Sequence, residues 1–230
     1  MRSTSFGPAV FLVGGLAGLL AVAQQSPPAP TAPPPRFVVV LDAAHGGDDT
    51  GGRLGDNQLE KAFTLALSVR LRSLLGARGI QVVTTRESDA AVDSSKRAEI
   101  ANHAAAQACL VLHASASGSG VHLFSSSLAP AQPVRFPAWR TAQAAWVTRS
   151  LALAGSLNST LLRAGMNVTL GRTALPALDS MTCPAVAVEV APELGPDKKV
   201  TAALDDPGYQ ARVASTLAAA LVAWRAEGHP

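Results

Sequence analysis

Three short apolar runs in this chain each end on a residue that can bind a metal ion or move a proton. The end residues are His45, His113 and Glu189. Apolar runs of this length indicate strands that are buried on both faces of a sheet. In open α/β sheets, functional sites gather at the carboxyl ends of the strands. We therefore expect these side chains to lie near one another at one edge of a sheet.

Segments with strand and helix patterns alternate along the rest of the chain. In residues 59–77, for example, Phe63 and several leucines recur on one stripe of a helix. The expected strands are residues 37–42, 80–84, 109–113, 121–124, 176–179 and 184–189, and the expected helices are residues 59–77, 94–107, 138–164 and 207–226. Strands separated by helices favour a single α/β domain, with a mixed, mostly parallel sheet of about six strands and helices on both faces.

The first 35 residues lie outside this alternation. Residues 7–23 are apolar apart from glycine and one proline, and they end on Ala-Val-Ala, a cleavage pattern for secretory signals. Residues 24–35 are rich in proline, which makes an extended spacer. We predict a signal peptide (1–23), a Pro-rich linker (24–35) and a domain (36–230) that is exported to the periplasm or cell envelope. An uncleaved membrane anchor is the alternative, because the apolar stretch approaches a spanning length.

Net charge and cysteine content limit the kinds of partner and metal site that the chain can have. The formal net charge is +3 without a clustered basic stripe, so nothing supports a nucleic-acid partner and none is expected. The two cysteines, Cys109 and Cys183, are too few for a four-cysteine zinc module. In an oxidising compartment they can pair, and two buried free thiols fit the sequence equally well. We expect a monomer.

Four residues carry the chemistry that the sequence indicates: His45, Glu60, His113 and Glu189. Two imidazoles and one carboxylate are ligands that a catalytic zinc ion takes, and a second carboxylate can move a proton. Taken singly, each residue also has a structural explanation. A glutamate in the first turn of a helix, as expected for Glu60, interacts favourably with the helix dipole. The functional interpretation therefore depends on all four residues together.

Glu189 is the most informative of the four, because a carboxylate at the end of an apolar strand is costly to bury without a function or a counter-charge. Its structural alternative is an ion pair with Arg86 or Arg97. We expect both arginines to form a structural ion-pair group with Asp89. His122 lies in an expected strand, and we interpret it as an exposed or satisfied strand residue rather than a fourth metal ligand.

At these residues the chain resembles the zinc-dependent N-acetylmuramoyl-L-alanine amidases, which are bacterial cell-wall hydrolases. The resemblance runs over residues 37–223 in six ordered segments. The matching segments are Asp-Ala-Ala-His-Gly-Gly at 42–47, Glu-Lys at 60–61, Thr-Arg-Glu-Ser-Asp at 85–89, Arg97 with Ala-Asn at 101–102, Val-Leu-His-Ala-Ser at 111–115, and Pro-Ala-Val-Ala-Val-Glu at 184–189.

The resemblance implies a role for each of the four residues. His45, Glu60 and His113 would bind Zn²⁺, and Glu189 would be the catalytic carboxylate. The implied substrate is peptidoglycan, and the implied scissile bond is the amide between N-acetylmuramic acid and L-alanine. A catalytic zinc site of this kind keeps three protein ligands and leaves one position open for water.

Two departures from the family pattern leave alternatives open. Ala43 and Ala44 replace Pro-Gly before the first histidine, and Ser115 replaces the asparagine that follows the second. One alternative is therefore a catalytically weak or inactive relative that binds peptidoglycan, and another is a zinc amidohydrolase that acts on a different amide. The sequence identifies neither an activator protein nor a stem-peptide preference.

Overall fold

The computed structural model describes residues 1, 3 and 7, and then residues 36–55, 58–133, 135 and 138–228. The chain divides into one unit of Met1–Pro34 and a second of Pro35–Pro230. All described helices and strands belong to the second unit. The predicted signal peptide and linker lie almost entirely outside the described residues. Within the described part of the chain, no helix has both the length and the apolar character needed to span a membrane.

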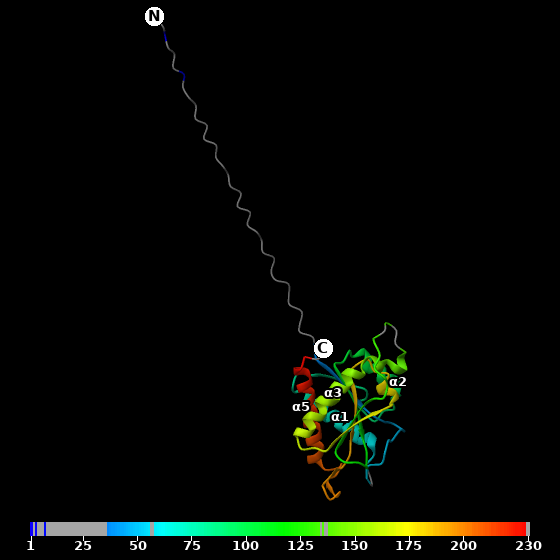
Figure 1. Ribbon diagram of the computed structural model, residues 1–230. Helices are drawn as coiled ribbons and strands as arrows, with labels where there is room; N and C mark the ends of the chain where they lie inside the picture. Colours follow the sequence, from blue (N-terminus) through cyan, green and yellow to red (C-terminus); the bar gives the residue numbers. More distant parts are fainter. Residues whose placement is uncertain are drawn as a thin grey trace. The chain divides into compact units, whose positions relative to one another are not determined.

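The second unit is built on a six-stranded sheet in the order β2-β1-β3-β6-β4-β5 (Figure 1). The strands are β1 (Val38–Ala43), β2 (Gln81–Thr84), β3 (Ala108–Ala114), β4 (Val121–Ser126), β5 (Val168–Thr173) and β6 (Ala185–Val190). All pairs are parallel except β4 with β6, which is antiparallel. The predicted mixed, mostly parallel sheet is confirmed.

Helices cover both faces of this sheet, and a two-stranded sheet lies outside it. The helices are α1 (Glu60–Gly76), α2 (Ser94–His103), the short 3-10 helix η1 (Trp139–Ala145), α3 (Val147–Arg163), α4 (Pro176–Asp179) and α5 (Pro207–Ala226). The small sheet consists of β7 (Glu193–Leu194) and β8 (Val200–Ala202).

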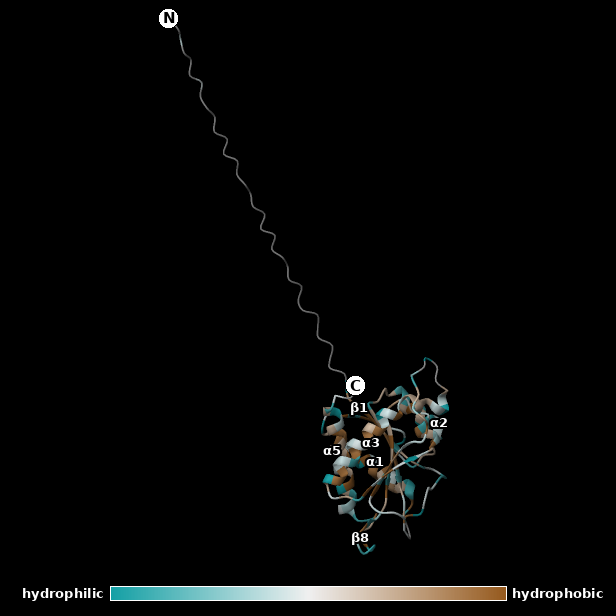
Figure 2. Ribbon diagram, in the orientation of Figure 1, coloured by the Kyte–Doolittle hydropathy of each residue, from teal (hydrophilic) through white to brown (hydrophobic). Residues whose placement is uncertain are grey.

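Two apolar clusters form because alternate residues of each strand point to opposite faces. In the larger cluster, Leu112 and Val188 pack with α1, α3 and α5. In the smaller one, Cys109 and Ala187 pack with α2 and α4. Helix α5 contacts both α1 and α3, whereas α2 lies on the opposite side (Figure 1). Hydrophobic residues run along α1, α3 and α5 (Figure 2). The predicted placement of helices on both faces is confirmed.

A disulfide bond joins Cys109 in β3 to Cys183, just before β6. Both residues are buried. The sequence left pairing and free thiols equally open, and the structure shows the pair. The bond therefore links the two neighbouring strands that carry His113 and Glu189.

The structure corrects the sequence prediction at two elements. Residues 176–179 form the helix α4 and not a strand, because Pro176 occupies the first helical turn, where its fixed φ and missing N–H are favourable. The sixth strand is instead β5, an edge strand whose Leu170 is 54% exposed. The expected helix 138–164 is divided at Trp146 into η1 and α3. The helix expected over 94–107 ends at His103, shortly before Ala105 takes a left-handed φ of 47°.

Candidate metal centre and active site

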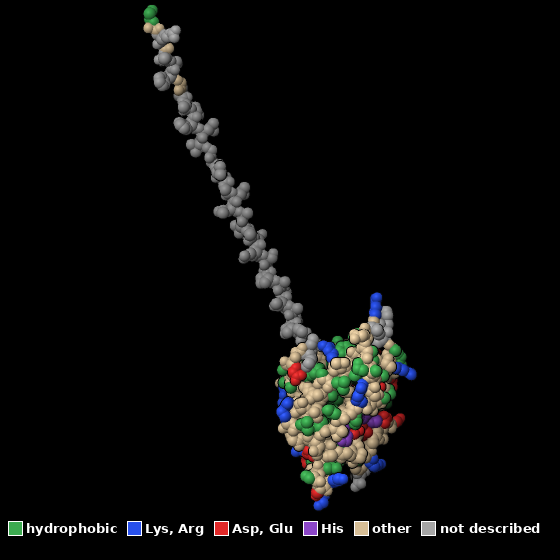
Figure 3. All heavy atoms as spheres, viewed as in Figure 1, with side chains coloured by type: hydrophobic (Ala, Val, Ile, Leu, Met, Phe, Trp, Pro, Cys, Tyr) green, Lys and Arg blue, Asp and Glu red, His purple; other side chains and the backbone are tan. Residues whose placement is uncertain are grey.

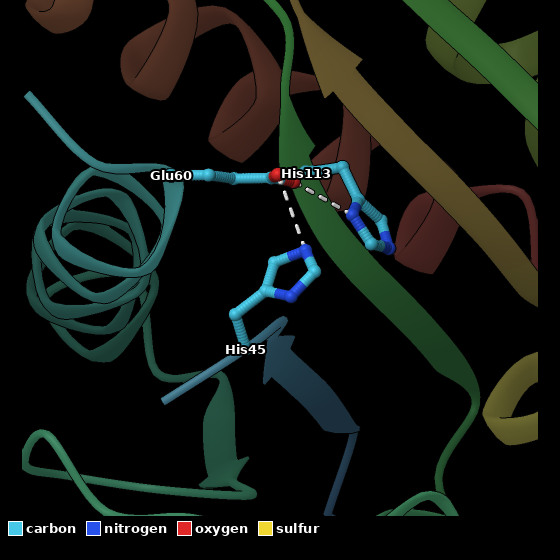
Figure 4. Close-up of side chains that lie close together, drawn as sticks. All are labelled: His45, Glu60 and His113. Carbon is cyan, nitrogen blue, oxygen red and sulfur yellow. Dashed lines mark hydrogen bonds and ion pairs between the residues drawn. The ribbon is translucent and has the colours of Figure 1, made fainter. Parts of the chain in front are cut away.

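Three of the predicted site residues converge beyond the carboxyl ends of β1 and β3 (Figure 4). His45 follows β1, Glu60 begins α1, and His113 lies near the end of β3. His45 Nε2 is 3.2 Å from Glu60 Oε2, and His113 Nδ1 is 2.8 Å from Glu60 Oε1. One donor atom from each residue lies within 4.8 Å of the others, so the three side chains can share one cation.

The loop after β1 brings His45 to Glu60 through an unusually close backbone approach. His45 itself has a left-handed φ of 63°. Gly51 has a φ of +64°, and a Cβ there would lie 2.6 Å from the His45 ring and 2.8 Å from Glu60 Oε2. Gly52 donates its backbone N–H to Glu60 Oε2 at 2.8 Å. Glycine at position 51 therefore allows the loop to lie directly against two candidate ligands.

Hydrogen bonds keep the carboxylate of Glu60 ionised. Burial alone would raise the pKa of Glu60, but hydrogen bonds from both histidines and from two backbone amides hold the pKa of its carboxyl well below its usual range. The hydrogen bond to Glu60 raises the pKa of His45, with Asp49 adding to that effect and burial opposing it. The carboxylate is thus ionised and faces imidazole nitrogens, which are suitable donors for a divalent transition metal.

Asp49 supports the metal-binding interpretation from the other side of the His45 ring. His45 Nδ1 lies 2.8 Å from Asp49 Oδ2, so Nε2 is left to face Glu60. A carboxylate on the far nitrogen fixes the tautomer and the orientation of a metal-binding histidine. Histidine and acidic side chains gather on the same part of the visible surface in Figure 3. Two oriented imidazoles and one buried carboxylate fit the requirements of a zinc ion.

Glu189 lies on the same face of the sheet and in the same row as His113. Its register partner in β3 is His113, and its register partner in β4 is His122. The carboxylate of Glu189 accepts a hydrogen bond at 2.8 Å from His122 Nδ1. The structure therefore gives Glu189 a histidine partner, not the ion pair with Arg86 or Arg97 that we considered as its structural alternative. Its side chain is 31% exposed and open to a substrate.

Other charged side chains hold the loops around the site. Arg97 Nη1 donates to the buried Asp42 Oδ1 at 2.6 Å, and Lys61 Nζ pairs with Asp89 Oδ2 at 2.7 Å. Arg86 donates to backbone carbonyl oxygens, among them that of Ala43. These contacts are structural, but they are not the ion-pair group that we expected, because Arg86, Asp89 and Arg97 each bind a different partner.

A hollow of about 590 Å³ opens beside two of the three candidate ligands. Its wall includes His45 and His113 together with Asp93, Arg97, Leu175 and Pro176. Ser115, which replaces the asparagine of the family pattern, has its hydroxyl oxygen 3.0 Å from that of Ser117. The hollow gives a substrate access to the edge of the sheet where the ligands meet.

Comparisons of sequence and of structure both find N-acetylmuramoyl-L-alanine amidases. A model of the N-acetylmuramoyl-L-alanine amidase family matches residues 39–223. The germination-specific N-acetylmuramoyl-L-alanine amidase of Bacillus subtilis is 34% identical over 93 residues, which is 34% of this chain and 39% of that protein. The N-acetylmuramoyl-L-alanine amidase AmiA of Escherichia coli is 39% identical over 77 residues, which is 34% of this chain and 27% of that protein. The matches thus span well under half of either relative.

A solved structure shares the fold. The catalytic domain of CwlV, an N-acetylmuramoyl-L-alanine amidase from Bacillus (Paenibacillus) polymyxa var. colistinus, superposes with a TM-score of 0.64 at 24% identity. The superposition covers 83% of this chain and 98% of that one.

Proposed function

This chain belongs to the N-acetylmuramoyl-L-alanine amidase family, and we propose that it is a zinc-dependent hydrolase of the amide between N-acetylmuramic acid and L-alanine in peptidoglycan. The observation that carries the proposal is the convergence of His45, Glu60 and His113 within 4.8 Å. Glu189 lies beside this cluster in the same row of the sheet. Family membership supplies the substrate, and the geometry supplies residues able to act on it.

In this proposal His45, Glu60 and His113 would hold the zinc ion, and Asp49 orients the ring of His45. Zinc bound there supplies a water of lowered pKa and a Lewis acid for the lactyl carbonyl. Glu60 is only 6% exposed, so its carboxylate is largely shielded from water.

Glu189 would move the proton. Its carboxylate takes a proton from the attacking water and later passes it to the nitrogen of the leaving L-alanine. The two transfers balance, because the water adds its oxygen to the lactyl carbon while both of its protons end on the products. The partial exposure of Glu189 suits this role, since the carboxylate must reach both the water and the departing amine.

Fragment analysis tests the proposal. The zinc-loaded protein is incubated with purified peptidoglycan, and released fragments are identified by mass spectrometry. We expect free stem peptides with an L-alanine amino terminus, no release after chelation, and recovery when zinc is returned. Binding without any release would instead favour an inactive peptidoglycan-binding relative. Fragments cut at a different amide would identify an amidohydrolase with another substrate.

We also propose that the protein acts outside the cytoplasm, in the periplasm or cell envelope, where peptidoglycan lies. The predicted signal peptide in residues 1–23 and the disulfide bond support this location. The expected monomer stays a prediction that light scattering after gel filtration can test.

A further inference from the structure

His122 lies on the side of Glu189 that faces away from the candidate metal ligands. The strand order places β6 between β3 and β4, so Glu189 has His113 on one side and His122 on the other. We propose that His122 is a positioning residue, which donates from Nδ1 to Glu189 Oε1 and leaves the other carboxylate oxygen for the reacting water. This inference rests on the proposed amidase function.

The contacts of the His122 ring assign its tautomer. The backbone N–H of Ser119 points at His122 Nε2 with an N···N distance of 3.4 Å. A backbone amide can only donate, so Nε2 must be the acceptor of the ring. The proton of the neutral ring then lies on Nδ1, which is 2.8 Å from Glu189 Oε1. His122 therefore donates to Glu189 Oε1 and leaves the other carboxylate oxygen without this contact.

A glycine-containing loop holds this ring in place. Gly118 has a φ of +94°, and a Cβ there would lie 2.2 Å from His122 Cε1, so only glycine lets the loop close on the ring. Ser119 is fixed in turn, because its hydroxyl oxygen accepts from the backbone N–H of Leu194 and from Asn167 Nδ2, each at 3.0 Å. The His122 side chain is only 15% exposed. The ring is thus anchored on the side opposite Glu189.

Anchoring matters because Glu189 is partly exposed and would otherwise sample several side-chain conformations. A general base must lie within hydrogen-bond reach of the proton that it takes. A misplacement of about 1 Å can cost about 10²-fold in rate. Fixing one carboxylate oxygen through His122 limits the positions that the other oxygen can take.

Steady-state kinetics on peptidoglycan fragments test the role of His122. We expect His122→Leu, which keeps bulk but removes the donor, to lower kcat by about 10–100-fold with KM and zinc content unchanged. His122→Asn should restore most of the loss, because its amide nitrogen can take the place of Nδ1. The matched control is His103→Leu, at a histidine on α2 that is 80% exposed. A wild-type kcat in His122→Leu, or no recovery in His122→Asn, would overturn the inference.

A second measurement does not depend on catalytic activity. NMR of the zinc-loaded wild-type protein with labelled histidine ring nitrogens reports the tautomer of His122, which is assigned by its loss in the His122→Asn spectrum. We expect a protonated Nδ1 and an unprotonated Nε2. The opposite tautomer would refute the role of His122 even in an active enzyme. An inactive wild-type protein would refute the proposed function while leaving the tautomer result valid.

Discussion

At the scale of single residues, Glu189 separates metal binding from catalysis. Its carboxylate contacts His122 and not the Glu60 cluster in the described contacts. We predict that Glu189→Gln binds zinc as the wild type does and loses about 10²–10⁴-fold in hydrolysis. Zinc content and fragment release are measured on the same sample, with Glu99→Gln on the exposed face of α2 as the control. Full activity in Glu189→Gln would show that another group takes the proton.

Asp49 offers a second residue-scale test, because among the candidate ligands its carboxylate hydrogen-bonds only His45 in the described contacts, and it also accepts from the backbone N–H of Gly51. We predict that Asp49→Asn weakens zinc affinity by about 10–100-fold, since the ring of His45 loses the carboxylate that orients it. Asp48→Asn removes the same charge from the neighbouring position and serves as the control. Zinc affinity is measured by competition with a chelating dye. Equal affinities of the two variants would show that Asp49 does not contribute to zinc binding.

The sequence predicted the three clustered side chains because each stands where an apolar run or a helix begins or ends. His45, Glu60 and His113 meet in the structure as that pattern implied. The partnership of Glu189 with His122 could not be predicted in the same way. It depends on the antiparallel pairing of β4 with β6, a contact between residues far apart in sequence that no local pattern records.

At the scale of secondary-structure elements, the buried pair of Arg97 and Asp42 joins α2 to the end of β1. Asp42 is 1% exposed and also accepts from Thr85 Oγ1 at 2.6 Å. We predict that Arg97→Ala lowers the free energy of unfolding by about 3–5 kcal/mol, because it leaves a buried carboxylate without its counter-charge. Chemical denaturation measures the change.

A surface pair on the same helix provides the control for that prediction. Lys96 and Glu99 lie 2.9 Å apart with both side chains about half exposed. Lys96→Ala should therefore cost only about 0–1 kcal/mol. If Arg97→Ala cost no more than Lys96→Ala, burial of the Arg97–Asp42 pair would not be a main support of the loop that leads to His45.

Element prediction failed where local signals were short or weak. Residues 176–179 are too few to display a helical period, and their apolar character suggested a strand. Strand β5 was overlooked because it lies at the sheet edge, where exposed polar residues and Gly171 dilute the alternation. Long, strongly patterned elements such as α1 were predicted to within a few residues of their ends.

At the scale of the whole molecule, alternating strands and helices predicted the α/β class, and strand order came only from the structure. The site draws its ligands from β1, α1 and β3, so a bound ion would tie three elements together. We predict that zinc at about 100 times its Kd stabilises the fold by about 2.7 kcal/mol. Thermal unfolding with and without chelator measures this gain. Glu60→Gln should lose most of this stabilisation by zinc. If zinc stabilised that variant as much as the wild type, the ion would bind elsewhere.

The central claim is that His45, Glu60 and His113 hold one zinc ion. Anomalous diffraction at the zinc absorption edge, from crystals of the zinc-loaded protein, tests it most directly. We predict a single strong peak about 2.0–2.2 Å from one nitrogen of each histidine and from a carboxylate oxygen of Glu60. A peak that fails to contact all three residues, or no peak at this edge of the sheet, would contradict the account.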